Sequence, residues 1–238
     1  MGLNHSPIIV ALDVGSAEEA VRLAKALEPH VGGFKVGLGL LHGPGPGVIG
    51  AIGALGKPVF ADAKLHDIPS QVAAAARRLG RWGARWVTAH AGGGPAMLEA
   101  AVTGLEAGSD GAAGILGVTV LTSLDQADLA AVGVTATPGK LVSRMARVIA
   151  AAGCEGIVCS PRELGVVADV APNLVTVIPG IRPAGTDMGD QSRVATPQEA
   201  LERGAAWLVI GRPITAATDP VAAAASIASS VVDSAGPA

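Results

Sequence analysis

The chain has 238 residues, of which 50% are hydrophobic and 16% charged, and its formal net charge is −3 at pH 7. This balance is enough for one domain with a substantial core and excludes an intrinsically disordered protein. With 2% aromatic residues, no Tyr and no dominant basic patch, the chain lacks the stacking and cationic surfaces that nucleic-acid-binding proteins use, so we expect no nucleic-acid partner.

The apolar stretches are interrupted by Gly, Pro or charged residues before they reach the length of a transmembrane helix, so no membrane partner is expected. Residues 1–7 lack the basic segment and the long apolar core of a signal peptide. The two cysteines, Cys154 and Cys159, have no spacing typical of a metal site or a disulfide framework. Together these features predict a cytoplasmic protein.

Strand-like and helix-like segments alternate along the whole chain. Eight short apolar runs have the composition of buried strands: residues 8–12, 33–37, 59–61, 86–89, 114–120, 156–159, 175–178 and 207–210. Helix-like stretches are found at residues 16–27, 70–82, 95–106, 140–152, 161–169, 197–203 and 220–232. Start signals support the first and the last helix, since Ser16 with Glu19 has the pattern of a capping box and Asp219 precedes Pro220.

Hydrophobic strands that alternate with amphipathic helices are typical of a parallel sheet covered by helices. About eight such units predict an α/β fold, a (β/α)8 TIM barrel formed as a single domain by residues 1–238. The alternative is an open doubly wound sheet, which is marked by a Gly-rich fingerprint after the first strand. Residues 13–18 lack this fingerprint.

A charged string, Asp62, Lys64 and Asp67, follows directly on the third apolar run. Residues i and i+2 of a strand face the same side, so Asp62 and Lys64 should point into one space, with Asp67 in the loop beyond. Charges at the end of a buried strand are costly unless they are paired. The string is therefore either a structural ion pair or a catalytic site.

Polar residues also end most of the other predicted strands. In a barrel the active site lies at the carboxyl ends of the strands, so these side chains should converge on one mouth. They are Asp13, Lys35, Asp62 with Lys64, His90, Thr122 with Ser123, Arg182 and Arg212. Each alone is compatible with an ordinary surface residue, whereas their convergence favours a catalytic site, in which we expect His90 to support other groups rather than act as a base.

The segments after the seventh and eighth strands predict a phosphate site, because barrels often bind phosphate with these loops and a short helix N-terminus. Arg182 follows the seventh run, and Gly211 and Arg212 follow the eighth. Glycine permits a close approach of the backbone, and arginine presents a planar fork of donors to an oxyanion. The alternative is a glycine turn beside a surface arginine. The long polar stretch 181–195 has the character of a lid.

The chain closely resembles the orotidine 5′-phosphate decarboxylase family over nearly its whole length. The matching segments, in chain order, are residues 10–13, 34–37, 62–69, 120–123, 179–183, 189–193 and 210–215. The resemblance implies that Lys35, Asp62, Lys64 and Asp67 form an alternating array of charges. Within it, Lys64 would deliver a proton to C6 of the pyrimidine.

The resemblance also implies how the substrate is held. The implied contacts are Asp13 and Lys35 at the ribose, Thr122 and Ser123 at the pyrimidine, and Arg182, Gln191, Gly211 and Arg212 at the phosphate. Asp67 and Ile68 would come from the second subunit of a homodimer with shared active sites. The chain departs from the family at Gln71, where the family usually has Thr, and a longer amide can still donate to a ribose hydroxyl.

The implied chemistry explains the residue types. Loss of CO2 from orotate leaves an electron pair at C6 with no adjacent carbonyl to accept it. The sequence shows no cofactor motif, so the protein must supply electrostatic stabilisation alone. We therefore expect an enzyme that converts the small molecule orotidine 5′-phosphate to UMP with no metal and no organic cofactor.

Two alternatives remain at this point. Metal-dependent phosphosugar enzymes of the same superfamily, such as hexulose-phosphate synthase, resemble the chain in the charged string. They typically carry an acidic metal ligand on the second strand and Ala-Gly after the second Asp, where this chain has Lys35 and Ile68-Pro69. The other alternative is a non-catalytic phosphate-binding barrel, which does not need the opposed carboxylates of Asp62 and Asp67.

Overall fold

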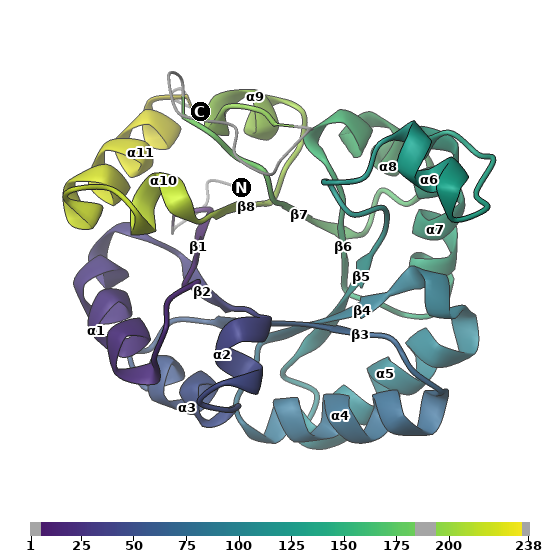
Figure 1. Ribbon diagram of the computed structural model, residues 1–238, viewed down its shortest axis with the longest axis horizontal. Coiled ribbons are helices and arrows are strands. Elements are labelled where there is room, and N and C mark those ends of the chain that lie inside the picture. The colour runs from purple at the N-terminus through teal and green to yellow at the C-terminus, as the bar shows by residue number, and fades with distance from the viewer. Residues whose placement is uncertain (1–5, 184–193, 235–238) are drawn as a thin grey trace.

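The computed structural model describes residues 6–183 and 194–234 and forms a closed barrel in which every strand is parallel to its neighbours in chain order (Figure 1). The strands are β1 (Ile8–Ala11), β2 (Gly33–Val36), β3 (Val59–Leu65), β4 (Trp86–His90), β5 (Gly114–Val118), β6 (Gly156–Val158), β7 (Val175–Ile178) and β8 (Trp207–Ile210). Because β1 pairs with both β2 and β8, the predicted TIM barrel is confirmed and the open-sheet alternative is wrong.

Helices surround the barrel and separate consecutive strands (Figure 1). They are α1 (Ala17–Leu27), α2 (Leu38–His42), α3 (Gly47–Gly53), α4 (Pro69–Arg81), α5 (Pro95–Ser109), α6 (Gln126–Ala131), α7 (Pro138–Ala151), α8 (Leu164–Val170), α9 (Pro197–Glu202), α10 (Arg212–Thr215) and α11 (Pro220–Ser234). Short 3-10 turns are η1 (Glu28–His30), η2 (Ala91–Gly93) and η3 (Pro161–Glu163). In the part of the chain that is described, no helix is long and apolar enough to cross a membrane.

The structure differs from the sequence prediction in four respects. The third strand continues to Leu65 instead of ending at Ala61, and the predicted helix 161–169 is split into η3 and α8. The short helices α2, α3, α6 and α10 were not predicted. At the start of α1 the Ser16 hydroxyl accepts from the Glu19 amide as expected, but the Glu19 carboxylate accepts from the Gly15 amide, so only half of the capping box forms.

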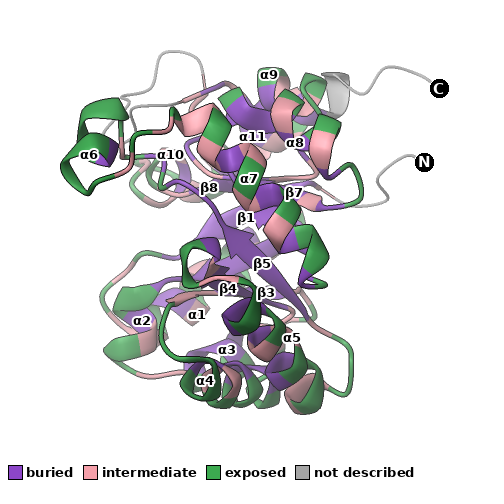
Figure 2. Cartoon of the chain, turned by 90° about the vertical axis from the view of Figure 1, so that its right-hand side faces the viewer, coloured by how far each residue is buried: buried purple, intermediate pink, exposed green. Residues whose placement is uncertain are grey.

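The apolar side chains form two separate layers because successive residues of each strand face opposite sides of the barrel wall. The larger cluster fills the space between the strands and the helices. The smaller cluster fills the barrel interior and consists of Ile9, Ala11, Phe60, Trp86, Leu116, Val177 and Val209. Figure 2 shows the strands as mostly buried, and the exposed residues lie on the surrounding helices and loops.

The amino end of the barrel is closed by aromatic rings and an ion pair. The rings of Trp86 and Trp207 meet edge to face with their centroids 5.3 Å apart. Glu155 accepts two hydrogen bonds of 2.7 Å from the Arg85 guanidinium and one of 2.9 Å from the Trp86 indole. Burial raises the pKa of Glu155, but these hydrogen bonds and the charge of Arg85 outweigh that effect and hold the pKa below its usual value.

The helices α4 and α5 approach each other closely, because glycine lines the face of α5 that meets α4. A Cβ atom at Gly104 would overlap the backbone of Ala73, and one at Gly108 would overlap the backbone of Arg77. Only glycine permits this spacing of the two backbones. The contact fixes α4, whose amino end carries the loop that follows β3.

Candidate active site

A cavity of about 520 Å³ opens at the carboxyl ends of the strands. Its floor includes Ala11, Phe60 and Val209, which belong to the apolar layer inside the barrel. The predicted site residues that line it are Asp13, Lys35, Asp62, Lys64, Thr122, Ser123, Arg182, Gly211 and Arg212. The structure brings these residues together at one mouth, whereas His90, which was predicted to converge with them, does not line the cavity.

Four of these side chains form an unbroken row of alternating charge. The ammonium of Lys35 lies 3.3 Å from Oδ1 of Asp13 and 3.6 Å from Oδ2 of Asp62. The other carboxylate oxygen of Asp62, Oδ1, accepts a hydrogen bond of 2.7 Å from the Lys64 ammonium. The side chains of Lys35 and Asp62 are 11% and 13% exposed, so the centre of the row is shielded from solvent, whereas Asp13 at its end is 62% exposed.

Strand register explains why these side chains meet. Ala11 pairs with Lys35 and Lys35 with Phe60 across three neighbouring strands. Ala11 and Phe60 face the barrel interior, so Asp13 and Asp62, each two residues further along, face the same interior one layer higher.

Lys64 reaches the row by a different route from the one the sequence suggested. The predicted proximity of Asp62 and Lys64 is confirmed, but the regular strand geometry assumed for it is wrong. Lys64 has φ = +46°, and the pairing of β3 with β4 shifts register between Ala61 and Leu65. A left-handed backbone at a residue other than glycine costs on the order of 1–3 kcal/mol, and such conformations cluster at functional sites.

The electrostatics of the row centre on Asp62. Burial by itself raises the pKa of Asp62. The charges of Lys35 and Lys64 act in the opposite direction, as do hydrogen bonds donated by Lys64 and Thr88, and together they hold the pKa below its usual value. Asp62 is therefore a carboxylate at neutral pH and accepts hydrogen bonds without donating any.

Thr88 is a member of this network that the sequence analysis missed. It is completely buried in β4, and its hydroxyl lies 3.0 Å from Asp62 Oδ1 and 2.9 Å from the backbone nitrogen of Lys64. The sequence offered one indication of this position: Thr88 lies two residues before His90 in an otherwise apolar strand, so both side chains face the interior.

The rings of His66 and His90 pack against each other near the mouth, with their centroids 5.3 Å apart. The pKa of His90 is lowered, first by burial and then by the charges of His66 and Lys64, while Asp62 acts in the opposite direction. The His90 ring is therefore neutral at pH 7. Neither histidine is among the residues that line the cavity.

On the side of β7 and β8, the cavity wall contains the two predicted phosphate-binding arginines, Arg182 and Arg212. The backbone amide of Arg182 donates to the carbonyl of Ala195 at 2.9 Å, which joins the two ends of the predicted lid. Gly211 precedes α10, and a Cβ atom added there would lie within ordinary contact distance of Ala11 and Asp13. Gln191 and most of the predicted lid lie outside the described residues.

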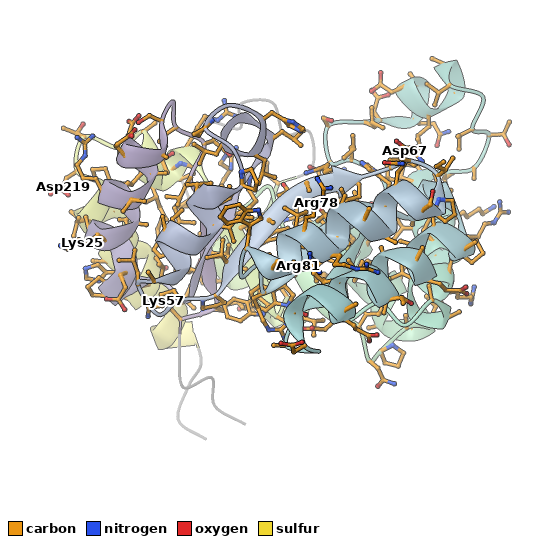
Figure 3. All side chains as sticks on the ribbon, turned by 90° about the horizontal axis from the view of Figure 1, so that it is seen from below. Lys25, Lys57, Asp67, Arg78, Arg81 and Asp219 are labelled. Atoms are coloured by element: carbon orange, nitrogen blue, oxygen red, sulfur yellow. The ribbon has the colours of Figure 1, made fainter. Side chains whose placement is uncertain are left out.

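Three predicted substrate contacts lie away from the cavity wall of their own chain. Asp67, Ile68 and Gln71 are exposed, and none of these described residues lines the cavity. Figure 3 shows Asp67 at the amino end of α4, at the edge of the molecule. The Asp67 carboxylate accepts from the neighbouring Ile68 amide at 2.6 Å, and Ile68 is 62% exposed. Their roles in substrate binding stay predictions.

A closed (β/α)8 barrel with a buried row of charges at its mouth, and arginines after its last two strands, defines the class of barrel enzymes that act on phosphorylated small molecules. The sequence profile of the orotidine 5′-phosphate decarboxylase / HUMPS family matches residues 6–227. The chain therefore belongs to this family.

Similar proteins of known name agree with the family assignment. Orotidine 5′-phosphate decarboxylase of Anaeromyxobacter sp. (strain K) is 50% identical over 222 residues, which cover 93% of this chain and 96% of that protein. The protein of the same name from Moorella thermoacetica is 48% identical over 230 residues, 94% of this chain and 91% of its own. A crystal structure of orotidine 5′-phosphate decarboxylase from Lactobacillus acidophilus, 34% identical, matches 95% of this chain and 99% of its own with a TM-score of 0.83.

Replacement of Asp62 by Asn should destabilise the fold, because Lys35 and Lys64 would lose the anion that they share. We expect the free energy of unfolding at pH 7 to fall by about 2–4 kcal/mol, somewhat less than for a fully buried pair. The folded-state pKa of Asp62 is depressed, so its charge contributes fully above the unfolded pKa of about 3.9 and less as the pH falls through the folded value. The difference between the two proteins should thus be constant above roughly pH 5 and shrink below pH 4.

Urea unfolding followed by circular dichroism at pH 7, 5 and 3 measures this difference. The matched control is Glu28→Gln, which breaks the more exposed pair between Glu28 and Lys57, with an N–O distance of 3.2 Å. We expect the control to change stability by less than about 1 kcal/mol. Equal stability of Asp62→Asn and the wild type at pH 7 would contradict the role of Asp62 in joining the two cations.

Proposed function

We propose that this protein decarboxylates orotidine 5′-phosphate to UMP in pyrimidine biosynthesis, using electrostatic stabilisation by its own side chains and no metal or organic cofactor. The observation that carries the proposal is the row Asp13–Lys35–Asp62–Lys64 along the cavity wall. The family membership and the names of the relatives support the same substrate.

In the proposed reaction, the bond from C6 to the carboxylate carbon breaks, CO2 leaves, and the bonding electron pair stays on C6. Lys64 is the group suited to this charge, since its ammonium lies at the cavity wall and is held by Asp62. One N–H proton of Lys64 then passes to C6, and the resulting neutral amine regains a proton from solvent. A fixed cation in a shielded site stabilises developing charge without reorganisation during the reaction.

The remaining wall residues suggest how the substrate lies. Arg182 and Arg212 would take the phosphate on the β7 and β8 side, and Thr122 and Ser123, after β5, would contact the pyrimidine. Binding energy gained at the phosphate, remote from C6, can be used to orient the reacting carbon against Lys64. Asp13 and Lys35 would contact the ribose between these two ends.

The metal-dependent phosphosugar reading is disfavoured by the position of Lys35. Its ammonium is buried on β2 and lies 3.6 Å from Asp62, so a divalent cation bound to Asp62 would meet a like charge at short range. A barrel that only binds phosphate would not need Lys64 at the cavity wall, and so would not need the strained backbone that places it there.

We further propose that the enzyme works in the cytoplasm as a homodimer in which Asp67 and Ile68 complete the partner's site, with Gln71 near the ribose. Residues 66–71 are all exposed, and the exposed fraction of 62% at Ile68 is high for an isoleucine. Burial of this loop against a second copy would bring a carboxylate to the open end of the charged row.

Purified protein should convert orotidine 5′-phosphate to UMP at full rate in EDTA, measured as loss of substrate absorbance. Lys64→Ala should lose turnover while its affinity for UMP stays close to that of the wild type, because the ammonium acts at C6 and not on the phosphate. Turnover that appears only when Mg²⁺ is restored to the chelated protein would overturn the metal-free proposal.

Arg212→Ala should weaken UMP binding by about 1.5–3 kcal/mol, the worth of one charge-assisted hydrogen bond, or roughly 10- to 150-fold in Kd. Calorimetric titration with UMP and with phosphate-free orotidine measures the effect, with the exposed Arg203→Ala outside the cavity as the matched control. An equal loss of affinity for both ligands would show that Arg212 does not hold the phosphate.

Subunit mixing tests the shared site. Lys64→Ala and Asp67→Ala proteins should each be nearly inactive, while their hybrid dimers have one doubly damaged and one intact site. With random pairing half the dimers are hybrids, so activity should rise to roughly a quarter of the wild-type value per subunit. Lys64→Ala mixed with Asp62→Ala is the matched control and should show no recovery, because both residues belong to one chain's row. No recovery in the first mixture, once mass spectrometry has shown subunit exchange, would place Asp67 in its own chain's site.

A further inference from the structure

We propose that Thr88 is a positioning residue, whose hydroxyl holds the backbone and the ammonium of Lys64 in the geometry that the reaction needs. The inference rests on the proposed function, since it takes Lys64 as the proton donor. Thr88 does not line the cavity, so it would act through Lys64 and Asp62 and not on the substrate.

The hydrogen-bond directions around Thr88 follow from the chemistry of its partners. The backbone N–H of Lys64 can only donate, so it donates to the Thr88 oxygen across 2.9 Å. The Asp62 carboxylate can only accept, so the single hydroxyl proton of Thr88 points to Oδ1 of Asp62 across 3.0 Å. With no exposed surface, Thr88 has no water to replace either partner.

These bonds close a ring through Lys64. Oδ1 of Asp62, which accepts from the Thr88 hydroxyl, also accepts from the Lys64 ammonium at 2.7 Å. The backbone amide and the side-chain end of Lys64 are therefore tied to the same carboxylate oxygen, one through Thr88 and one directly. Such closed polar networks hold a side chain in one arrangement more strictly than a single ion pair does.

Strand pairing explains why a side chain is needed at this point. Ala61 pairs with Val87, and Leu65 pairs with Ala89, so residues 62–64 of β3 face the single residue Thr88 of β4. The bulge takes the Lys64 amide out of the regular ladder, and its φ of +46° departs from strand geometry. The Thr88 hydroxyl supplies the acceptor that the neighbouring backbone would otherwise provide.

Loss of the Thr88 hydroxyl should affect turnover and leave phosphate binding unchanged. Without the hydroxyl, the buried Lys64 amide loses its acceptor and Asp62 loses a donor, so the bulge has no contact that fixes it. A displacement of the Lys64 ammonium by a fraction of an ångström to one ångström lowers the rate of proton transfer strongly. Phosphate binding, on the β7 and β8 side, does not depend on this bulge.

The test compares Thr88→Val, which has the same shape without the hydroxyl, with Thr88→Ser, which keeps the hydroxyl. We expect Thr88→Val to lower kcat by about 10- to 100-fold while Kd for UMP changes less than about 3-fold, and Thr88→Ser to stay within about 3-fold of the wild-type kcat. If Thr88→Val does not fold, Thr88→Ala takes its place. A kcat for the hydroxyl-free variant within about 2-fold of wild type, or a Thr88→Ser variant as slow as Thr88→Val, overturns the proposal.

Thr176→Val is the matched control. Thr176 is also a buried threonine of a barrel strand, and its hydroxyl donates to the Gly204 carbonyl and accepts from the Ala206 amide, both at 2.9 Å, without lining the cavity. This control should lose thermal stability to a similar degree and keep its kcat within about 2-fold, which separates positioning from general destabilisation. A Thr176→Val variant as slow as Thr88→Val overturns the positioning role.

Amide hydrogen exchange at Lys64 gives a readout that does not depend on the reaction. Exchange should be faster in Thr88→Val than in the wild type or in Thr176→Val, because the Lys64 amide loses its acceptor. Unchanged exchange at Lys64 overturns the inference about Thr88. A wild-type protein that does not decarboxylate orotidine 5′-phosphate overturns the proposed function instead, and the exchange result then still decides whether Thr88 holds Lys64.

Discussion

The architecture of the site depends on one buried carboxylate, that of Asp62. Its two oxygens are divided between two cations, with Oδ2 facing Lys35 at 3.6 Å and Oδ1 bound to Lys64 at 2.7 Å. Two ammonium groups at the mouth of an apolar barrel would repel each other and lose hydration without such an anion. The requirement to keep Asp62 charged and centred explains the register of β1, β2 and β3, and it gives a reason for the bulge that turns Lys64 back toward Asp62.

The barrel places the Asp62 carboxylate in low-polarity surroundings, where its charge interacts strongly with neighbouring charges. Beneath the row lies the apolar layer that includes Ala11, Phe60 and Val209, so the charges face low-polarity side chains on one side and the cavity on the other. At a given distance, Coulomb interactions are stronger in such a setting than in water. A ligand that covers the cavity would remove the remaining solvent and strengthen the interactions between the row and any charge that develops next to it.

The parts of the structure that follow from local pattern were predictable from the sequence, and those that depend on distant contacts were not. All eight strands were predicted because continuous apolar runs of this length are characteristic of a barrel wall. The helix α3 was missed because Gly47–Gly53 has weak intrinsic helix propensity, and its buried residues Val48, Ile49 and Ile52 show that tertiary packing stabilises it.

The candidate site shows the same difference between residues that the local sequence pattern predicts and residues whose place depends on distant contacts. Asp62, Lys64, Arg182 and Arg212 could be assigned to the cavity because polar residues at strand ends converge in any barrel. Thr88 was missed, because its spacing from His90 indicates only that it faces the interior, and its contact with Lys64 depends on the register shift opposite it. The loop that carries Asp67 differs again, since it is exposed and does not line the cavity of its own chain, so the role of Asp67 stays a prediction.

The two ends of the barrel show how an enclosed ion pair differs from an ion pair at a cavity wall. At the amino end, the Glu155 carboxylate accepts three hydrogen bonds, two from Arg85 and one from Trp86. All of its partners therefore belong to the base of the barrel. At the carboxyl end, the Lys64 ammonium donates to Oδ1 of Asp62, and Lys64 also lines a cavity large enough for a ligand. An ammonium has three donors, so the bond to Asp62 fixes its direction and leaves capacity for a group in the cavity. Asp62 and Lys64, near the end of β3, are thus an ion pair by geometry, and their position at the cavity wall is what would suit them to catalysis.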